Sequence, residues 1–144
     1  MQHNKTENYR NEKELNYYGS DYNKFLRKEC SKKMTVNNID VVQYKNDFKS
    51  KTETIRIVES KHGNESFGTN QEKILQILAR AFKYLNGIQK KYIFQVYIVR
   101  GDPPFEKTII TDLINDKTFN VDKKELINFS EFKENVTATS SINR

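Results

Sequence analysis

The order of hydrophobic patterns along the chain predicts an α/β fold, with a mixed β-sheet packed against helices. Two observations carry this prediction. Runs with a period of two, which mark strands, stand on both sides of one long segment with helical periodicity, residues 69–87. The segment that follows, residues 92–99, is apolar on both faces apart from Gln95, as expected for a strand in the centre of a sheet.

The first half of the chain contains the patterns of one short helix and two strands. A helix is predicted over residues 22–31, with Ser20 or Asp21 as its N-cap. The β-branched run at residues 39–44 predicts a strand. Residues 52–62 alternate with a period of two and predict a second strand.

The second half begins with the long helix. Residues 69–72 match a capping box at its start, and Asn86-Gly87 predicts a left-handed end. After a turn at residues 100–104, residues 108–114 predict a further strand, and residues 122–125 resemble a capping box that opens a short last helix. The apolar stripe of the long helix consists of Ile74, Leu75, Ile77, Leu78, Ala81, Phe82 and Leu85.

The length and composition suit one compact domain. The 144 residues are 35% hydrophobic and 12% aromatic, which suffices for one modest core. We expect a flexible segment over residues 1–12, a single domain over residues 13–135 and a disordered tail over residues 136–144.

The charge balance favours an anionic partner. Lys and Arg number 25 against 19 Asp and Glu, a formal net charge of +6, and nucleic acid is the commonest partner for such a surplus. A soluble domain that is merely rich in lysine explains the charge equally well. The single cysteine, Cys30, excludes an internal disulfide framework and a cysteine-based zinc site, and it fits a reducing, cytoplasmic location. No apolar run reaches the roughly 18 residues of a membrane span, so we expect no membrane partner.

The end of the second predicted strand carries ionisable residues on an otherwise apolar face. Glu59 and Lys61 follow Ile55 and Ile57 with a period of two, about 7 Å apart along the strand. If the two predicted strands pair antiparallel, Asp40 lies beside Glu59. Two carboxylates at a sheet edge repel unless a cation lies between them, and Mg²⁺ prefers such oxygen ligands. Lys61 could then orient or deprotonate an attacking water, or stabilise charge on a pentavalent phosphorus.

This arrangement resembles the PD-(D/E)XK nuclease superfamily: Asp40, then 18 intervening residues, then Glu59-Ser60-Lys61, then an amphipathic helix. The resemblance implies a restriction-endonuclease-like core with the order αβββαβ, and hydrolysis of phosphodiester bonds with Mg²⁺, for which Mn²⁺ can substitute. It implies that Asp40 and Glu59 are metal ligands, that the Ser60 carbonyl is a backbone ligand and that Lys61 is the catalytic lysine. Gln71 resembles a glutamine that approaches the site in some branches of the superfamily.

The chain departs from the superfamily pattern at three places. Ile39 stands where a proline is common, and Leu75 stands where those branches place a tyrosine four residues after the glutamine. Only residues 34–36 are available for the first strand of the core. Some members take an additional acidic ligand from the first helix, for which the candidates here are Glu14, Asp21 and Glu29.

The sequence therefore predicts a Mg²⁺-dependent deoxyribonuclease, and a homodimer would let it cut both strands of a duplex. The alternative is a non-catalytic nucleic-acid-binding or protein-interaction module on the same fold. In a still simpler interpretation, Glu59 and Lys61 form an ordinary exposed charge pattern, worth under about 1 kcal/mol. The complete set of Asp40, Glu59 and Lys61 favours the enzyme, because nothing structural requires all three together.

Overall fold

The computed structural model describes residues 21–30, 39–66, 68–133 and 141–143. The chain divides into two compact units, Met1–Asn38 and Ile39–Arg144, which we describe separately. Residues 1–12, expected to be flexible, lie outside the described part of the chain. No helix among the described residues is long and apolar enough to cross a membrane.

In the first unit the structure describes one helix. Helix α2 (Asp21–Glu29) forms where the sequence predicts a helix, with the acidic Asp21 in its first turn. Its exposed aromatic side chains, Tyr22 and Phe25, stack on each other with their ring centroids 6.3 Å apart.

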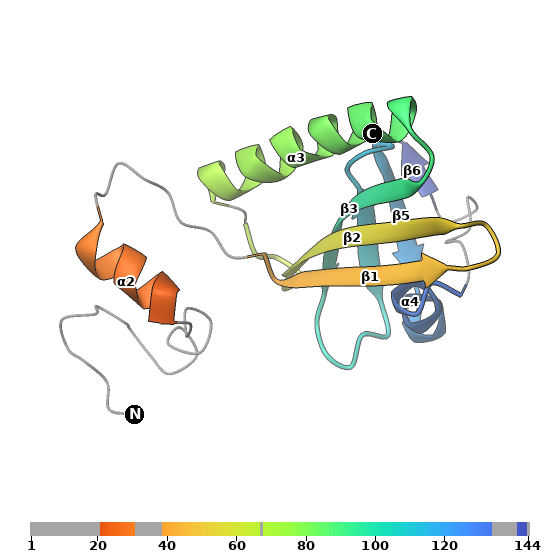
Figure 1. Ribbon diagram of the computed structural model, residues 1–144. Helices are drawn as coiled ribbons and strands as arrows, with labels where there is room; N and C mark the ends of the chain where they lie inside the picture. The colour runs from red at the N-terminus through yellow and green to blue at the C-terminus, as the bar shows by residue number, and fades with distance from the viewer. Residues whose placement is uncertain (1–20, 31–38, 67, 134–140, 144) are drawn as a thin grey trace. The chain divides into compact units, whose positions relative to one another are not determined.

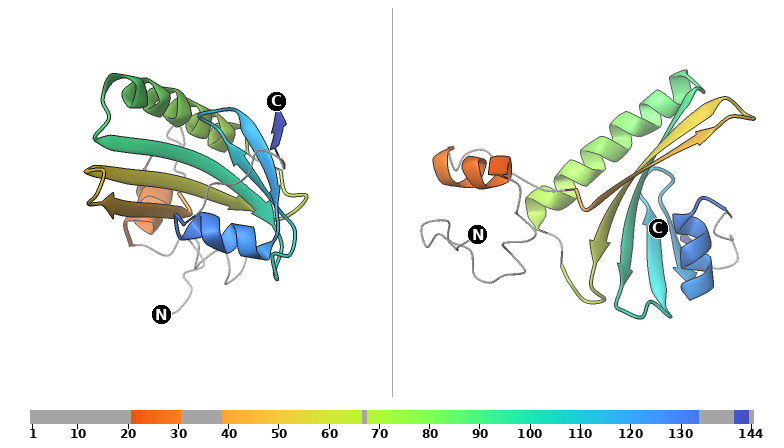
Figure 2. Two further views of the ribbon diagram at one scale, coloured as in Figure 1. Left: turned by 90° about the vertical axis from the view of Figure 1, so that its right-hand side faces the viewer. Right: turned by 60° about the horizontal axis from the view of Figure 1, so that its bottom comes forward.

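The second unit is built on a mixed sheet of six strands, which confirms the predicted α/β class. The strands lie in the order of the sequence, and only β2 and β3 are parallel, while all other neighbours are antiparallel. Helix α3 (Thr69–Ile88) makes the crossover between β2 and β3 and covers one face of the sheet, and α4 (Lys123–Ser130) covers the other (Figures 1 and 2). The strands are β1 (Val41–Asp47), β2 (Thr52–Lys61), β3 (Tyr92–Gly101), β4 (Thr108–Asp112), β5 (Lys117–Val121) and β6 (Ser141–Asn143).

Each face of the sheet carries its own hydrophobic cluster. On the α3 face, Leu75 and Ala79 pack against Val96, which is completely buried in the middle of β3. On the α4 face, Phe129 packs with Ile110 and other buried residues of β4 and β5. The central strand β3 therefore supplies apolar side chains to both layers, as its unbroken apolar sequence predicts.

The long helix begins and ends differently from the sequence prediction. Gly68 is the N-cap, no side chain caps this end, and the amide of Glu72 donates to the Gly68 carbonyl, so the predicted capping box over residues 69–72 was wrong. The predicted left-handed end at Asn86-Gly87 was also wrong, because the helix continues to Ile88. The Asn86 amide instead hydrogen-bonds both backbone groups of Phe94 on β3, which ties the last turn to the sheet.

The C-terminal part of the sheet has more strands than the sequence predicts. The strand predicted over residues 108–114 ends at Asp112, whose carboxylate accepts hydrogen bonds from the amides of Ile114 and Asn115 and turns the chain into β5. The capping box at residues 122–125 is confirmed in full at the start of α4. Within the expected tail, residues 141–143 form β6 and pair with β5.

The described residues hold part of the strand order that the superfamily resemblance implies. Two strands, β1 and β2, lie between α2 and α3, whereas the αβββαβ core has three. Residues 34–36, the only candidates for the additional strand, lie outside the described residues.

An arginine is buried on the α4 face of β2. Arg56 is 5% exposed, and its guanidinium carbon lies 3.8 Å from the ring centroid of Phe132 and 4.1 Å from that of Phe129. It donates to the Phe129 carbonyl at 2.6 Å and to Gln95 Oε1 at 2.8 Å. Burial lowers its pKa to about 10, which still leaves it charged at neutral pH.

We expect Arg56→Ala to lower the free energy of unfolding by about 2–4 kcal/mol, because it removes stacked apolar contact, leaves Gln95 Oε1 without this donor and takes one of its donors from the Phe129 carbonyl. Urea denaturation measures the effect. Arg80→Ala, at an exposed position of α3, is the control and should change stability by less than about 0.5 kcal/mol. Equal effects of the two substitutions would contradict a structural role for Arg56.

Candidate active site

The pairing of β1 with β2 brings Asp40 to the end of β2. The two strands are antiparallel, as predicted, and Val41 pairs with Val58, so Asp40 and Glu59 lie side by side at this end. The Asp40 carboxylate is fixed through one oxygen, Oδ2, which accepts from the Ser60 amide at 3.0 Å and from the Ser60 hydroxyl at 2.9 Å. The second carboxylate oxygen of Asp40, Oδ1, takes part in neither of these two hydrogen bonds.

The local setting of Asp40 corrects one sequence expectation. Asp40 does not lie inside a buried apolar strand but at a bend just before β1, and its apolar neighbours Ile39, Val41 and Val42 are exposed. The hydrogen bonds from Ser60 therefore hold Asp40 in place, rather than burial within an apolar strand. The amide and hydroxyl of Ser60 are the groups that contact Asp40. The superfamily resemblance instead implies that the Ser60 carbonyl is a metal ligand.

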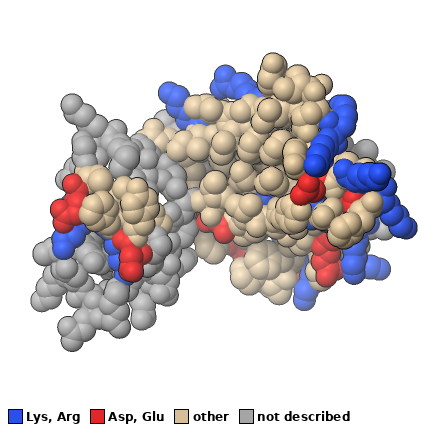
Figure 3. Space-filling view, in the orientation of Figure 1, with Lys and Arg blue, Asp and Glu red and all other residues tan. Residues whose placement is uncertain are grey.

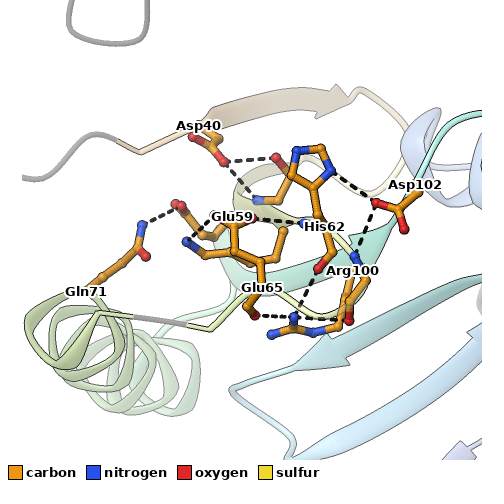
Figure 4. A network of polar contacts seen from close by, with 10 residues as sticks. Asp40, Glu59, His62, Glu65, Gln71, Arg100 and Asp102 are labelled. Atoms are coloured by element: carbon orange, nitrogen blue, oxygen red, sulfur yellow. Dashed lines mark hydrogen bonds and ion pairs between the residues drawn. The ribbon is translucent and has the colours of Figure 1, made fainter. Parts of the chain in front are cut away.

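Glu59 is the most deeply placed ionisable group of the site. Its side chain is 2% exposed on the α3 face, and Gln71, in the first turn of α3, donates Nε2 to Glu59 Oε1 at 2.5 Å (Figure 4). Burial and, to a smaller extent, the negative charge of Asp40 together raise the pKa of Glu59 to about 7. Glu59 is therefore partly protonated near neutral pH.

Lys61 lies two residues beyond Glu59 on the same face. Its side chain is 9% exposed, and its ammonium lies 3.8 Å from Glu65 Oε2. The positive charge of Lys61 lowers the pKa of Glu59, but burial and Asp40 outweigh it. The predicted combination of Asp40, Glu59 and Lys61 at one end of the sheet is thus present in the structure, and Gln71 joins it from the helix.

A second polar cluster supports the loop that links β2 to α3. In the parallel ladder Lys61 pairs with Arg100, whose guanidinium donates to the carbonyls of His62 and Glu65 (Figure 4). His62 Nδ1 lies 3.1 Å from Asp102 Oδ1, on an exposed part of the loop. Sequence reasoning missed Arg100 and Asp102, because their meeting with the loop depends on the register of two strands separated by a helix.

The structure places the other candidate residues differently. Glu65, interpreted from sequence as a solvated loop charge, accepts from the His62 amide and faces Lys61. Asp21 and Glu29 lie on α2 in the first unit, and Glu14 lies outside the described residues. Within the described ranges, no group of three or more His, Cys, Asp or Glu residues is arranged to hold a metal ion.

Comparisons with protein-family models, curated proteins and solved structures find no match to this chain. Any functional conclusion therefore depends on the residues themselves.

We expect Glu59→Gln to stabilise the metal-free protein at pH 8. The folded state holds the Glu59 proton with a pKa of about 7 against an ordinary 4.5, so wild type loses stability as the pH rises between these values. The variant carries no such charge and should be more stable by roughly 1–3 kcal/mol at pH 8, with the difference fading toward pH 4. Urea denaturation in EDTA at both pH values measures this.

The matched control for this measurement is Glu72→Gln, at an exposed position of α3. It should show no pH-dependent difference from wild type. If the difference in free energy of unfolding between Glu59→Gln and wild type were the same at pH 4 and pH 8, it would contradict a raised pKa at this position.

Proposed function

We propose that this chain is a metal-dependent nuclease that hydrolyses phosphodiester bonds in DNA, on a restriction-endonuclease-like core. One observation carries the proposal. Two carboxyl groups, Asp40 and Glu59, meet at the ends of adjacent strands, and the ammonium of Lys61 follows Glu59 on the same face. A purely structural sheet edge gains nothing from bringing two acids together, because their mutual repulsion is unfavourable at neutral pH.

The carboxyl pair fits a hard divalent cation. Asp40 and Glu59 supply oxygen ligands of the kind that Mg²⁺ and Mn²⁺ prefer, and metal binding would release the proton that Glu59 holds in part near neutral pH. When bound, the cation supplies Lewis-acid polarisation of the phosphoryl group. With only two carboxyl ligands, the remaining positions of an octahedral Mg²⁺ would be filled by water and substrate, as is usual for this ion.

The surrounding side chains position the reacting groups. Ser60 holds Asp40 through one oxygen only, and Gln71 fixes the orientation of Glu59. Lys61 is largely buried at the same end of the strand, where its ammonium can hold an attacking water or stabilise the negative charge that develops on the phosphate.

The charge of the chain supports an anionic substrate. A formal net charge of +6 attracts a nucleic-acid backbone, and the acidic pair is an exception within this basic chain. A basic protein that only bound DNA would have no use for two carboxyl groups at the approach of a phosphate. A homodimer of this small chain would place two sites on one duplex.

The proposal predicts metal-dependent cleavage that depends on two specific side chains. We expect Asp40→Asn and Lys61→Ala to slow Mg²⁺-dependent cleavage of plasmid or single-stranded DNA by at least about 100-fold. Lys124→Ala, at an exposed position of α4, removes the same charge as Lys61→Ala and should cleave at the wild-type rate. Equal cleavage by all four proteins would refute the catalytic assignment, and DNA binding without any cleavage would favour the non-catalytic module.

Metal binding also has a readout that is independent of activity. We expect Mg²⁺ or Mn²⁺ to raise the thermal midpoint of the wild-type protein, because a ligand that binds only the folded state stabilises it. EDTA should reverse the shift, and Glu59→Gln should abolish it. A shift of the same size in Glu59→Gln would place the metal elsewhere on the chain.

A further inference from the structure

The sheet has a second functional candidate at the end opposite the candidate active site. We infer that this end binds single-stranded nucleic acid through the turn of the β1–β2 hairpin and the first residues of β3. We call this region the hairpin surface, and it consists of Phe48, Lys49, Lys51, Lys90, Lys91 and Tyr92. Strand β2 separates it from Glu59 and Lys61 by about 20–30 Å, given the rise of about 3.3 Å per strand residue.

The turn of the hairpin holds an aromatic ring out in solvent. Phe48 is 83% exposed, more than any other large hydrophobic side chain among the described residues. The turn is well defined, because Asp47 Oδ1 accepts from the amides of Lys49 at 3.0 Å and Ser50 at 3.3 Å, and the Ser50 hydroxyl lies 2.7 Å from that of Thr52. The turn thus holds an aromatic face in solvent, where a partner can pack against it.

Lysines lie on two adjacent elements at this end of the sheet. The Glu53 amide donates to the Lys91 carbonyl at 2.9 Å, which holds the start of β3 beside the hairpin. Lys and Arg side chains gather at this end of the sheet in Figure 3. Lys49 and Lys51 are exposed and form no ion pair with a described residue. A second ring, that of Tyr92, is partly exposed, and the Lys91 ammonium lies 5.3 Å from its centroid.

The acidic groups near the hairpin surface are engaged within the protein. Asp47 caps the turn, and Glu53 accepts a hydrogen bond from the Tyr44 hydroxyl at 2.5 Å. Their charges are therefore directed at protein donors. Among the lysines of the surface, Lys90 donates to the Asn86 carbonyl at 3.2 Å, whereas Lys49 and Lys51 are exposed and can meet phosphates.

This combination of groups fits an unpaired strand of nucleic acid. Each of the two rings is adjacent in sequence to a lysine, so a face on which a base can stack stands next to a charge that can bind the phosphate. In a duplex the base faces are covered by their neighbours, so Phe48 would find no stacking partner. If this surface guides a substrate toward the active site, that role rests on the proposed nuclease function. The binding of nucleic acid by the surface does not depend on the proposed function.

Binding can be measured without cleavage, by fluorescence anisotropy of a labelled oligothymidine in EDTA with the full chain. We expect Phe48→Ala to weaken binding at least about fivefold, the loss typical of one stacked base. Phe48→Trp should restore it. Ile127→Ala, which truncates an exposed apolar side chain of α4, is the control and should bind like wild type. Phe48→Ala binding with wild-type affinity would overturn the stacking role.

The lysines are tested with a matched pair of double variants. Lys49→Glu/Lys51→Glu should weaken binding and reduce the slope of log affinity against log salt by about 1.4, at about 0.7 per lost phosphate contact. Lys123→Glu/Lys124→Glu makes the same change in net charge at exposed positions of α4. Equal losses in the two double variants would show that only overall charge matters, and would overturn the proposed surface.

Two further outcomes separate this inference from its competitors. Tighter binding of a duplex than of the single strand, or binding of phosphatidylserine vesicles without binding of the oligonucleotide, would overturn it. The proposed nuclease function can fail while this inference holds, because binding is measured in EDTA without cleavage. Lys61→Ala should bind oligothymidine normally under these conditions.

Discussion

Strand β2 is hydrogen-bonded on both sides, and its two registers decide which side chains meet at each end of the sheet. The antiparallel register with β1 brings Asp40 to Glu59 at one end and closes the turn that carries Phe48 at the other. The parallel register with β3 sets Lys61 beside Arg100. A slip of one residue in either register would turn the alternating side chains to the opposite face and separate these groups.

The same strand buries one ionisable group on each face, and the two are accommodated differently. On the α4 face Arg56 keeps its charge, because aromatic rings and acceptors enclose the guanidinium. On the α3 face burial raises the pKa of Glu59 to about 7, with the charge of Asp40 acting in the same direction and that of Lys61 opposing it. Arg56 is thus compensated by the protein alone. Glu59 is not compensated at neutral pH, and this is why we assign chemistry to its face.

The part of the site that depends on local pairing could be predicted from the sequence. Asp40 and Glu59 belong to consecutive strands with a short polar connection, for which antiparallel pairing is the simplest arrangement. The alternation of two then places Lys61 on the same face. Gln71 contacts Glu59 because α3 begins soon after β2 ends and carries Gln71 in its first turn. The N-cap of this helix, Gly68, was not predictable from the sequence pattern.

Other features depended on tertiary structure and left no local signal. The role of Arg100 requires the parallel register across a helical crossover, which no spacing in the sequence specifies. The end of β4 was missed because Asp112 uses its side chain to turn the chain, while apolar residues continue beyond it to Ile114. Asn86 likewise resembles a helix stop in the sequence, but it serves as a link to β3.

The burial of Glu59 also has a consequence for the order in which the protein folds. The contacts of the β1–β2 hairpin are local and form quickly, whereas the parallel pairing of β2 with β3, which places Ile98 beside Glu59, joins residues much farther apart in the sequence. The dehydration of this carboxyl group therefore belongs to a late step. In acid that step encloses a neutral group, and in alkali it must enclose a charge, so we expect the folding rate to carry the signature of a single proton.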